Sequence, residues 1–427
     1  MYMKRTLLTF GILAVAMLLP CVASAKNISG FPTVDGWDYT VYDDGTAELT
    51  KAPGATGAVV IPETITYEGN TYTVTKLGAN SFTDNLDITA IQLPSGLKEL
   101  GTRALAWCKN LETVTGGPEE LEFIAQYNLI DSKWMENQPE GPVYFKKWLI
   151  NFKGEYEEDV FALAEGTIGV MQWGKYSGIK SKVMRVPAST KDIDIASIMD
   201  VNPHGLYYLE RFEVDKGNTT YFNDEVGALY KNGESIAIKE VEYTGVSFKC
   251  LPQANPSKVY NVLPGTKFLA ANSLNTRSLE QFNAPDGVVY VGYNIFRFNS
   301  PKGVDLPSTV KEMYRAFFVA TNVETVVLRA IEVPEHSNDE FYKCQNTTLY
   351  VPDASVDAYK AAMAFSVVKQ ILPLSQYSAV KDVTAAETSA EVTAIYGIDG
   401  SVRTALQPGI NIVRYSDGTA RKVMHRE

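Results

Sequence analysis

The sequence predicts an α/β repeat solenoid, in which short strands and turns stack so that each repeat packs on its neighbours. An apolar-x-apolar-Pro pattern, typical of the end of a strand, recurs at residues 59–62, 91–94, 184–187, 304–307 and 349–352. Apolar anchors also recur at a fixed step, 23 residues from Leu77 to Leu100 and 22 residues from Leu269 to Val291 and from Val291 to Met313. This step of 22 or 23 residues is the period of a leucine-rich solenoid.

Each repeat is too short to bury its own apolar face, so the repeats are expected to share a continuous core. Ile88, Ile91 and Leu93 are expected to point inward, and the proline after them ends the strand because it cannot donate a ladder hydrogen bond. Leu306 and Val326 are expected in the same core. The residues between the inward positions alternate to the solvent side of the sheet. They form an outward row of Gln92, Thr115, Arg185, Glu213, Asn283, Asp305, Val327 and Tyr350.

Residues 1–25 predict a secretory signal peptide, with a positively charged start, an apolar run over residues 7–19 and small residues before a cleavage point after Ala25. A lipoprotein attached through Cys21 is the second interpretation, because Pro20 directly before the cysteine fits a lipobox poorly. The apolar run is short for a bilayer span, and no later stretch supplies one. We therefore expect a secreted or cell-surface protein that meets a membrane only through surface attachment.

Two segments carry a family resemblance. Residues 105–114 read Leu-Ala-Trp-Cys-Lys-Asn-Leu-Glu-Thr-Val, and residues 341–352 read Phe-Tyr-Lys-Cys-Gln-Asn-Thr-Thr-Leu-Tyr-Val-Pro. With these segments, residues 30–374 resemble the BspA-type leucine-rich repeat family of Bacteroidetes surface proteins. The resemblance implies a non-enzymatic protein that binds a protein partner, either a host matrix protein or a protein on another bacterial surface.

The resemblance also extends to details of the repeat. Residues 354–360 resemble the amphipathic helix that closes the family's last repeat, and Cys108 and Cys344 occupy a core position of the repeat. With Cys250, the cysteines of the exported chain are an odd number at wide spacing, which is no disulfide framework. We expect these cysteines to be small buried side chains.

The chain departs from regular repeats in several places. Hairpins are expected as insertions near 125–169 and 215–265, over residues 141–154 and 227–233, and the second contains the turn signal Asn232-Gly233. The expected organisation is a signal peptide over 1–25, an N-terminal β cap over 26–76, the solenoid over 77–374, a linker over 375–391 and a C-terminal β tail over 392–427.

The tail resembles the small β tail that acts as a sorting signal in exported Bacteroidetes proteins. Short strands are expected near residues 392–400 and 409–418, joined by Gly turns. The last residues, 422–427, depart from the basic and apolar ending of such tails. A terminal β module without a sorting role is an equal alternative.

Composition and motifs exclude several classes of function. The chain has 427 residues with 39 Lys and Arg against 50 Asp and Glu, a net charge of −11, which argues against a nucleic-acid binder. Three histidines make a histidine-rich metal site improbable. The pairs Ser95/Lys98 and Ser308/Lys311 match a Ser-x-x-Lys nucleophile pattern, but both fall at the same repeat position. We therefore expect no catalytic residues, no metal and no cofactor.

Three hypotheses of function remain open. In the first, the outward row of the solenoid sheet, Gln92, Thr115, Arg185, Glu213, Asn283, Asp305 and Tyr350, recognises a protein partner. In the second, the chain is a glycan-binding or glycan-processing accessory whose sugar platform is Trp134, Trp148 and Trp173. In the third, it is a structural component of the cell surface without a saturable ligand.

The signal peptide leads to a first testable prediction. N-terminal sequencing of the exported protein should read from Lys26, because cleavage follows Ala25. A chain that begins at an acylated Cys21 would instead identify a lipoprotein.

Overall fold

The computed structural model describes residues 28–171, 174–199, 205–296, 301–377, 392–397, 401–407, 409–415 and 420–425. The chain divides into two compact units, Met1–Gln376 and Tyr377–Glu427. The expected signal peptide lies outside the described residues, and so do residues 378–391 of the expected linker.

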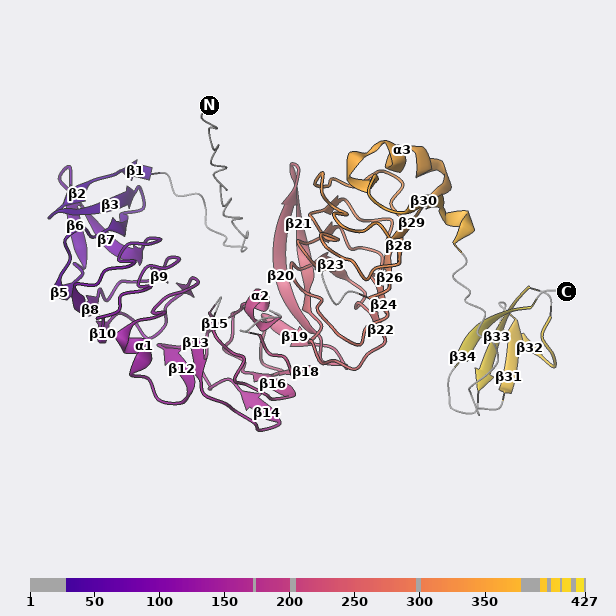
Figure 1. Ribbon diagram of the computed structural model, residues 1–427, viewed down its shortest axis with the longest axis horizontal. Coiled ribbons are helices and arrows are strands. Elements are labelled where there is room, and N and C mark those ends of the chain that lie inside the picture. Colours follow the sequence, from indigo (N-terminus) through magenta and orange to yellow (C-terminus); the bar gives the residue numbers. More distant parts are fainter. Residues whose placement is uncertain are drawn as a thin grey trace, which may run out of the picture. The chain divides into compact units, whose positions relative to one another are not determined.

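The first unit is a solenoid whose successive repeats each add a strand to two sets of parallel sheets (Figure 1). We call the set that holds the strands ending near the repeat prolines the front sheets. Among the described residues these sheets have the orders β5-β8-β10, β14-β16-β18 and β22-β24-β26-β28-β29-β30. Their strands are β5 (Gly57–Val60), β8 (Ile88–Leu93), β10 (Thr113–Gly116), β14 (Val160–Ala162), β16 (Val183–Val186), β18 (Arg211–Val214), β22 (Val259–Asn261), β24 (Gln281–Asn283), β26 (Gly303–Leu306), β28 (Thr325–Leu328), β29 (Thr348–Val351) and β30 (Gln370–Pro373).

The predicted apolar anchors form the second set, which we call the anchor sheets. Within the described residues they run β7-β9-β11, β13-β15-β17 and β21-β23-β25-β27. Their strands are β7 (Asn70–Leu77), β9 (Glu99–Leu100), β11 (Phe123–Ile124), β13 (Trp148–Lys153), β15 (Gly169–Val170), β17 (Asp192–Ile193), β21 (Val241–Cys250), β23 (Thr266–Leu269), β25 (Tyr290–Val291) and β27 (Glu312–Met313). Leu77 pairs in register with Leu100, and Leu269 with Val291, so the fixed step in the sequence is the step of strand pairing.

The leucine-rich repeat solenoid is therefore confirmed, and Leu306 and Val326 lie fully buried in its core. The described residues contain little helix: α1 (Lys133–Glu136), α2 (Ile195–Ile198), α3 (Val356–Ala361) and the 3₁₀ turns η1 (Asp353–Ser355), η2 (Met363–Phe365) and η3 (Leu374–Gln376). Turns follow the anchor strands instead, because residues such as Asn80, Arg103 and Asn272 take a positive φ that a right-handed helix does not allow.

The two ends of the first unit are closed by different elements. The N-terminal end is an antiparallel meander of β1 (Ile28–Gly30), β2 (Thr33–Val34), β3 (Trp37–Tyr42) and β4 (Thr46–Lys51), which continues into the anchor sheet through β7, itself paired with β6 (Thr64–Tyr67). At the other end α3 follows the last repeat, where the resemblance implied a closing helix. The buried Tyr359 of α3 donates its hydroxyl to the carbonyl of Ala330 at 2.9 Å, which ties the helix to the preceding repeat.

Both inserted hairpins exist, but the turn of the second one was predicted wrongly. β12 (Gly141–Phe145) pairs antiparallel with β13. The second insertion consists of β19 (Tyr221–Asn223), β20 (Leu229–Ile238) and β21, and the tip between β20 and β21 is Lys239-Glu240. Asn232 and Gly233 lie inside β20 where its register with β21 shifts, so the Asn-Gly pair makes a bulge and not a hairpin turn.

The inserted hairpins separate the core into segments and are buried on both faces where they do so. In β13, Trp148 and Ile150 belong to the N-terminal core segment, whereas Leu149 belongs to the middle segment, because successive side chains of a strand point to opposite faces. Beyond a register shift opposite Val143 and Tyr144, Phe152 also faces the middle segment, so β13 is a wall with apolar residues on both sides. The base of the β20–β21 hairpin repeats the arrangement: Leu229 and Cys250 face the middle segment, and Tyr230 and Phe248 face the C-terminal one.

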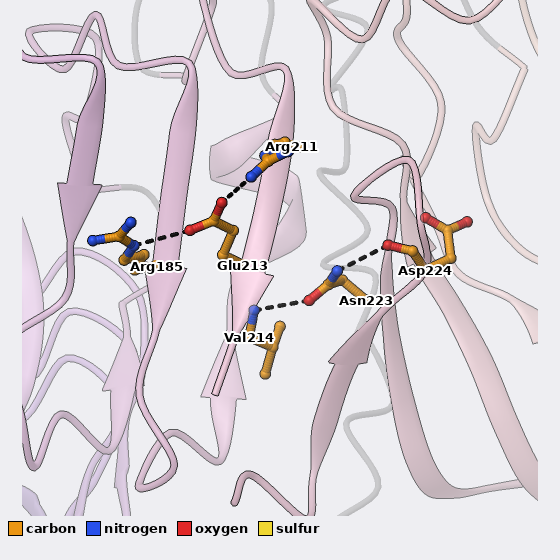
Figure 2. A network of polar contacts seen from close by, with 6 residues as sticks. All are labelled: Arg185, Arg211, Glu213, Val214, Asn223 and Asp224. Carbon is orange, nitrogen blue, oxygen red and sulfur yellow. Dashed lines mark hydrogen bonds and ion pairs between the residues drawn. The ribbon is translucent and has the colours of Figure 1, made fainter. Parts of the chain in front are cut away.

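A loop replaces a strand where the front sheets are interrupted between β18 and β22 (Figure 2). The backbone N–H of Phe212 donates to the carbonyl of Gly227 at 2.9 Å, and that of Val214 donates to Oδ1 of Asn223 at 2.8 Å. Gly227 has a φ of +85°, and a Cβ there would come within 2.1 Å of Cβ of Arg211. The glycine therefore lets the loop approach the edge of β18 closely enough to seal it.

The second unit is an antiparallel sheet of the order β32-β31-β33-β34 in its described part. Its strands are β31 (Val392–Gly397), β32 (Val402–Arg403), β33 (Gly409–Tyr415) and β34 (Ala420–His425). The buried Asn411 accepts a hydrogen bond from Nη1 of Arg403 at 2.9 Å and donates Nδ2 to the carbonyl of Gln407 at 2.7 Å. A small C-terminal β module was expected here.

A buried carboxylate connects two late repeats. Glu340 is fully buried and accepts hydrogen bonds from the backbone N–H groups of Arg315 at 2.6 Å and Ala316 at 2.5 Å, and from Oγ of Ser337 at 3.2 Å. Desolvation by burial raises the pKa of this carboxyl to about 7, although the hydrogen bonds act in the opposite direction.

The front-sheet register predicts a large contrast between neighbouring residues of β8. Leu93→Ala should lower the free energy of unfolding by about 2–5 kcal/mol, because Leu93 is buried between repeats. Gln92→Ala, one residue away on the exposed face, should change it by less than about 0.5 kcal/mol. Urea unfolding followed by circular dichroism measures both, and equal effects would mean that the register is wrong.

Glu340 predicts a pH-dependent contribution to stability. Its pKa is about 7 in the folded chain, above the ordinary 4.5, so its proton stabilises the fold fully below pH 4.5 and this contribution is lost as the pH rises towards 7. Relative to Glu340→Gln, the native chain should lose stability over this window by at most about 1.4 kcal/mol per pH unit. Unfolding midpoints of the two chains at a series of pH values test this. A difference that is constant, or that grows in favour of the native chain with pH, contradicts it.

Candidate functional site

The outward residues predicted from the sequence lie on the front sheets, but the register divides them into three groups. The pairing brings together Val60, Gln92 and Thr115 in one sheet, and Ala162, Arg185 and Glu213 in another. In the C-terminal sheet it aligns Asn261, Asn283, Asp305, Val327, Tyr350 and Leu372. We call these aligned residues the front row.

The N-terminal group is the least elaborate. Gln92 and Thr115 are both exposed and occupy matching positions on β8 and β10. Val60, beside Gln92 on the edge strand β5, is also exposed. This group offers one amide, one hydroxyl and one apolar side chain side by side.

The middle group is a charged cluster (Figure 2). Nε of Arg185 donates to Oε2 of Glu213 at 2.9 Å, and Arg211 contacts the other carboxylate oxygen of Glu213. Hydrogen bonds from Arg185, and then from Arg211, lower the pKa of the Glu213 carboxyl. The cluster therefore presents two guanidinium groups on one carboxylate, and Arg185 remains well exposed to a partner.

The C-terminal group is a polar network across neighbouring strands. Nδ2 of Asn283 donates to Oδ1 of Asn261 at 2.8 Å, and Nε2 of Gln281 donates to Oδ1 of Asn283 at 2.8 Å. Arg329 binds Asp305 in a two-pronged ion pair, with Nε to Oδ1 at 2.8 Å and Nη2 to Oδ2 at 2.7 Å. These contacts hold the side chains in fixed orientations on the sheet.

Sequence reasoning missed three members of this network, Gln281, Asn261 and Arg329. Asn261 lies one repeat step of 22 residues before Asn283, which was the available signal. Arg329 follows β28 at the position where Pro307 follows β26, so the absence of a proline at this repeat position was the available signal. Asn261 and Arg329 are recognisable only once the repeats are aligned.

Val327 was expected to face solvent, and this was wrong: it is fully buried despite its place in the front row. Asp305 and Tyr350 flank it on the adjacent strands. Strands lie about 4.8 Å apart, so the longer side chains on either side can cover a short valine. The row is therefore interrupted between its charged and its aromatic member.

The proposed sugar platform is not assembled by the described tryptophans. Trp148 is 1 % exposed and donates Nε1 to the carbonyl of Leu121 at 3.0 Å, because it packs in the wall made by β13. Trp134 is half-buried and lies edge-to-face on Phe145, with ring centroids 5.6 Å apart. Trp173 lies outside the described residues. A buried indole cannot stack on a sugar, so Trp148 was a wrong candidate.

Among the described residues, no group of three or more His, Cys, Asp or Glu side chains is placed to hold a metal ion. Cys108, Cys250 and Cys344 are buried and unpaired, and burial raises the pKa of the Cys108 and Cys344 thiols to about 11. In the described part of the chain, no helix is long and apolar enough to cross a membrane.

The similarity of this chain to a known family lies in its repeats. Residues 63–137 and 268–371 match, in six copies, the family described as the BspA type leucine rich repeat region. These two segments are therefore similar to BspA-type leucine-rich repeats. They include Gln92, Thr115 and the aligned row from Asn283 to Tyr350, whereas Arg185 and Glu213 lie between them.

Solved structures with similar repeats come from several bacteria. A leucine rich cell surface protein from Faecalibacterium prausnitzii is 15 % identical, with a TM-score of 0.39, covering 81 % of this chain and 94 % of that one. A leucine-rich repeat protein from Eubacterium ventriosum is 14 % identical, with a TM-score of 0.36 and coverage of 80 % and 84 %. A leucine-rich repeat protein from Bacteroides ovatus is 15 % identical, with a TM-score of 0.30 and coverage of 80 % and 76 %. A search of curated proteins finds no match.

Proposed function

We propose that this leucine-rich repeat protein is a non-enzymatic binding protein, secreted or held at the cell surface, that recognises a protein partner through its front row. The observation that carries the proposal is the polar C-terminal network, in which cross-strand hydrogen bonds and the Asp305–Arg329 ion pair hold side chains at fixed positions. Side chains that are already ordered lose less conformational entropy when a partner binds.

The chemistry of the front row favours a polar protein interface. The front row contains few exposed apolar side chains. Its members include the charged Arg185 and Glu213, the amides of Gln92 and Asn283 and the ring of Tyr350. Interfaces of this composition bind through dispersed hydrogen bonds and trapped water and not through one deep apolar pocket. Arginine and tyrosine are the residue types that contribute most at such interfaces, so Arg185 and Tyr350 are the expected anchors.

The signal peptide predicted from the sequence supports a role outside the cell. The predicted signal peptide would deliver the mature chain to the surface or the medium, with cleavage after Ala25 or, in the alternative, acylation at Cys21. A host matrix protein or a protein on another bacterial surface is the partner class that the family resemblance implies.

The proposal is tested by a binding screen followed by substitutions in the front row. Residues 26–427 are screened against host matrix proteins and, in parallel, against a glycan array. For a protein ligand found in this way, Arg185→Glu combined with Tyr350→Ala should weaken the dissociation constant at least about tenfold, a loss of about 1.4 kcal/mol. Surface plasmon resonance measures the effect.

Lys360→Glu on α3 is the matched control, because it reverses one exposed charge that belongs to a helix and not to the front row. It should leave the affinity unchanged within about twofold. A ligand bound equally well by the front-row variant contradicts the proposal. Saturable binding to glycans alone would favour the glycan-binding alternative, and no saturable ligand of either kind would favour a structural surface component.

A further inference from the structure

The outer half of the β20–β21 hairpin has an open strand edge. Residues 241–245 of β21 pair with residues 234–238 of β20, from Glu234 opposite Gly245 to Ile238 opposite Val241. β21 joins the anchor sheet through residues 246–248, which pair with β23. Within the described part of the chain, residues 241–245 therefore have a partner strand on one side only. Alternate backbone N–H and C=O groups on the other side are free to pair with an extended chain.

The same half of the hairpin is apolar on one face. Ile238 packs with Phe268 and Val289 in a small separate core, and Tyr243 lies against it. On the opposite face, Oγ of Ser235 and Oγ1 of Thr244 lie 2.7 Å apart. The hairpin thus lies with its apolar face over the outer side of the anchor sheet, and its tip extends towards the later repeats.

A groove of about 490 Å³ separates the hairpin from those repeats. One wall is formed by Ile238, Lys239, Val241 and Tyr243, and the other by Ser308, Val310, Lys311 and residues 330–335. Val241 on the first wall is 53 % exposed and Ile331 on the second is 69 % exposed. The groove has the size of a small ligand site and carries unusually exposed apolar side chains on both walls.

Charged side chains surround this apolar groove. Nζ of Lys239 at the hairpin tip pairs with Oε1 of Glu335 at 2.7 Å, which links the two walls. Both side chains are well exposed, so the link is weak and is screened by salt. Lys311 and Glu332, both exposed, add one charge of each sign to the lining of the second wall.

We propose that this groove binds an extended polypeptide segment in which an apolar residue is flanked by an acidic and a basic residue. The backbone of the segment adds to the open edge of β21, and its apolar side chain fills the space between Val241 and Ile331. Its acidic side chain pairs with Lys311 and its basic side chain with Glu332. Strand addition supplies directional hydrogen bonds, while the groove supplies side-chain selectivity.

The charges of the hairpin disfavour a second copy of the chain as the occupant. The exposed tip carries Lys239, Glu240 and Glu242. Antiparallel pairing of two identical β21 edges would bring Glu242 of one copy near Glu242 of the other, and like charges across strands repel each other. Charged residues at an exposed edge are a recognised protection against self-pairing. The groove is separate from the front row, so this inference does not rest on the proposed function.

Phage-displayed random linear peptides, selected on residues 26–427, test the inference. The selection is depleted first on a chain that carries Val241→Asp and Ile331→Asp, whose folding is checked by circular dichroism. Enriched peptides should share an apolar residue between an acidic and a basic one. When synthesised, they should bind the native chain at least tenfold more tightly than Val241→Asp.

Val392→Asp is the matched control, because Val392 is also a strand valine with 53 % exposure but belongs to the second unit. It should bind the peptides as the native chain does, and so should Arg185→Glu. Methylation of backbone nitrogens in the peptide should abolish binding at alternate positions only, which is the signature of strand addition.

Three results would overturn the proposal. The first is the absence of peptides enriched on the native chain over the depleting variant. The second is binding that no backbone methylation affects. The third is a concentration-dependent dimer, detected by light scattering, that Val241→Asp abolishes, because it would assign the groove to a second copy.

Discussion

The stacking of parallel strands at a step of 22 or 23 residues is the constraint on which the rest of this structure depends. A repeat has apolar surface on both sides, so every place where the stack begins, ends or changes must cover that surface. The N-terminal meander and α3 cover the ends. The inserted hairpins solve the same problem inside the array: Trp148 and Leu149 are neighbours in β13, yet they are buried in different core segments.

The inserted hairpins interrupt the front sheets. Each insertion ends one front sheet and begins another, which leaves strand edges between the sheets. At β18 the edge is sealed by a loop, with Gly227 close to Arg211 and Asn223 bonded to the backbone of Val214. The front row is divided into three groups for the same reason, and the residues of different groups do not form one continuous lattice.

Much of the fold was predictable because it repeats. The apolar anchors and the prolines that follow the strands recur in many repeats. A departure at one position therefore does not hide the pattern. Features that occur once were harder. Asn232-Gly233 has the composition of a hairpin turn, but the length of β20 places it within the strand, and Lys239-Glu240 forms the tip instead. Trp148 remained a candidate for the alternative sugar platform because nothing in the sequence near it shows that both faces of β13 are buried.

The candidate site was predictable at the level of positions and not of contacts. Period-two alternation placed Asn283 and Asp305 on the front sheet, but their partners Asn261 and Arg329 depend on the pairing register between strands far apart in sequence.

That register has physical consequences. A front row whose polar groups are already bonded to one another gains little from a few new contacts and needs a broad partner, since exposed polar pairs each contribute little. The open edge of β21 is different: its backbone groups, which pair with no second strand among the described residues, can gain several aligned hydrogen bonds from a single short strand. Two surfaces with opposite requirements thus follow from one architecture, the front row from regular stacking and the edge from the insertion that interrupts it.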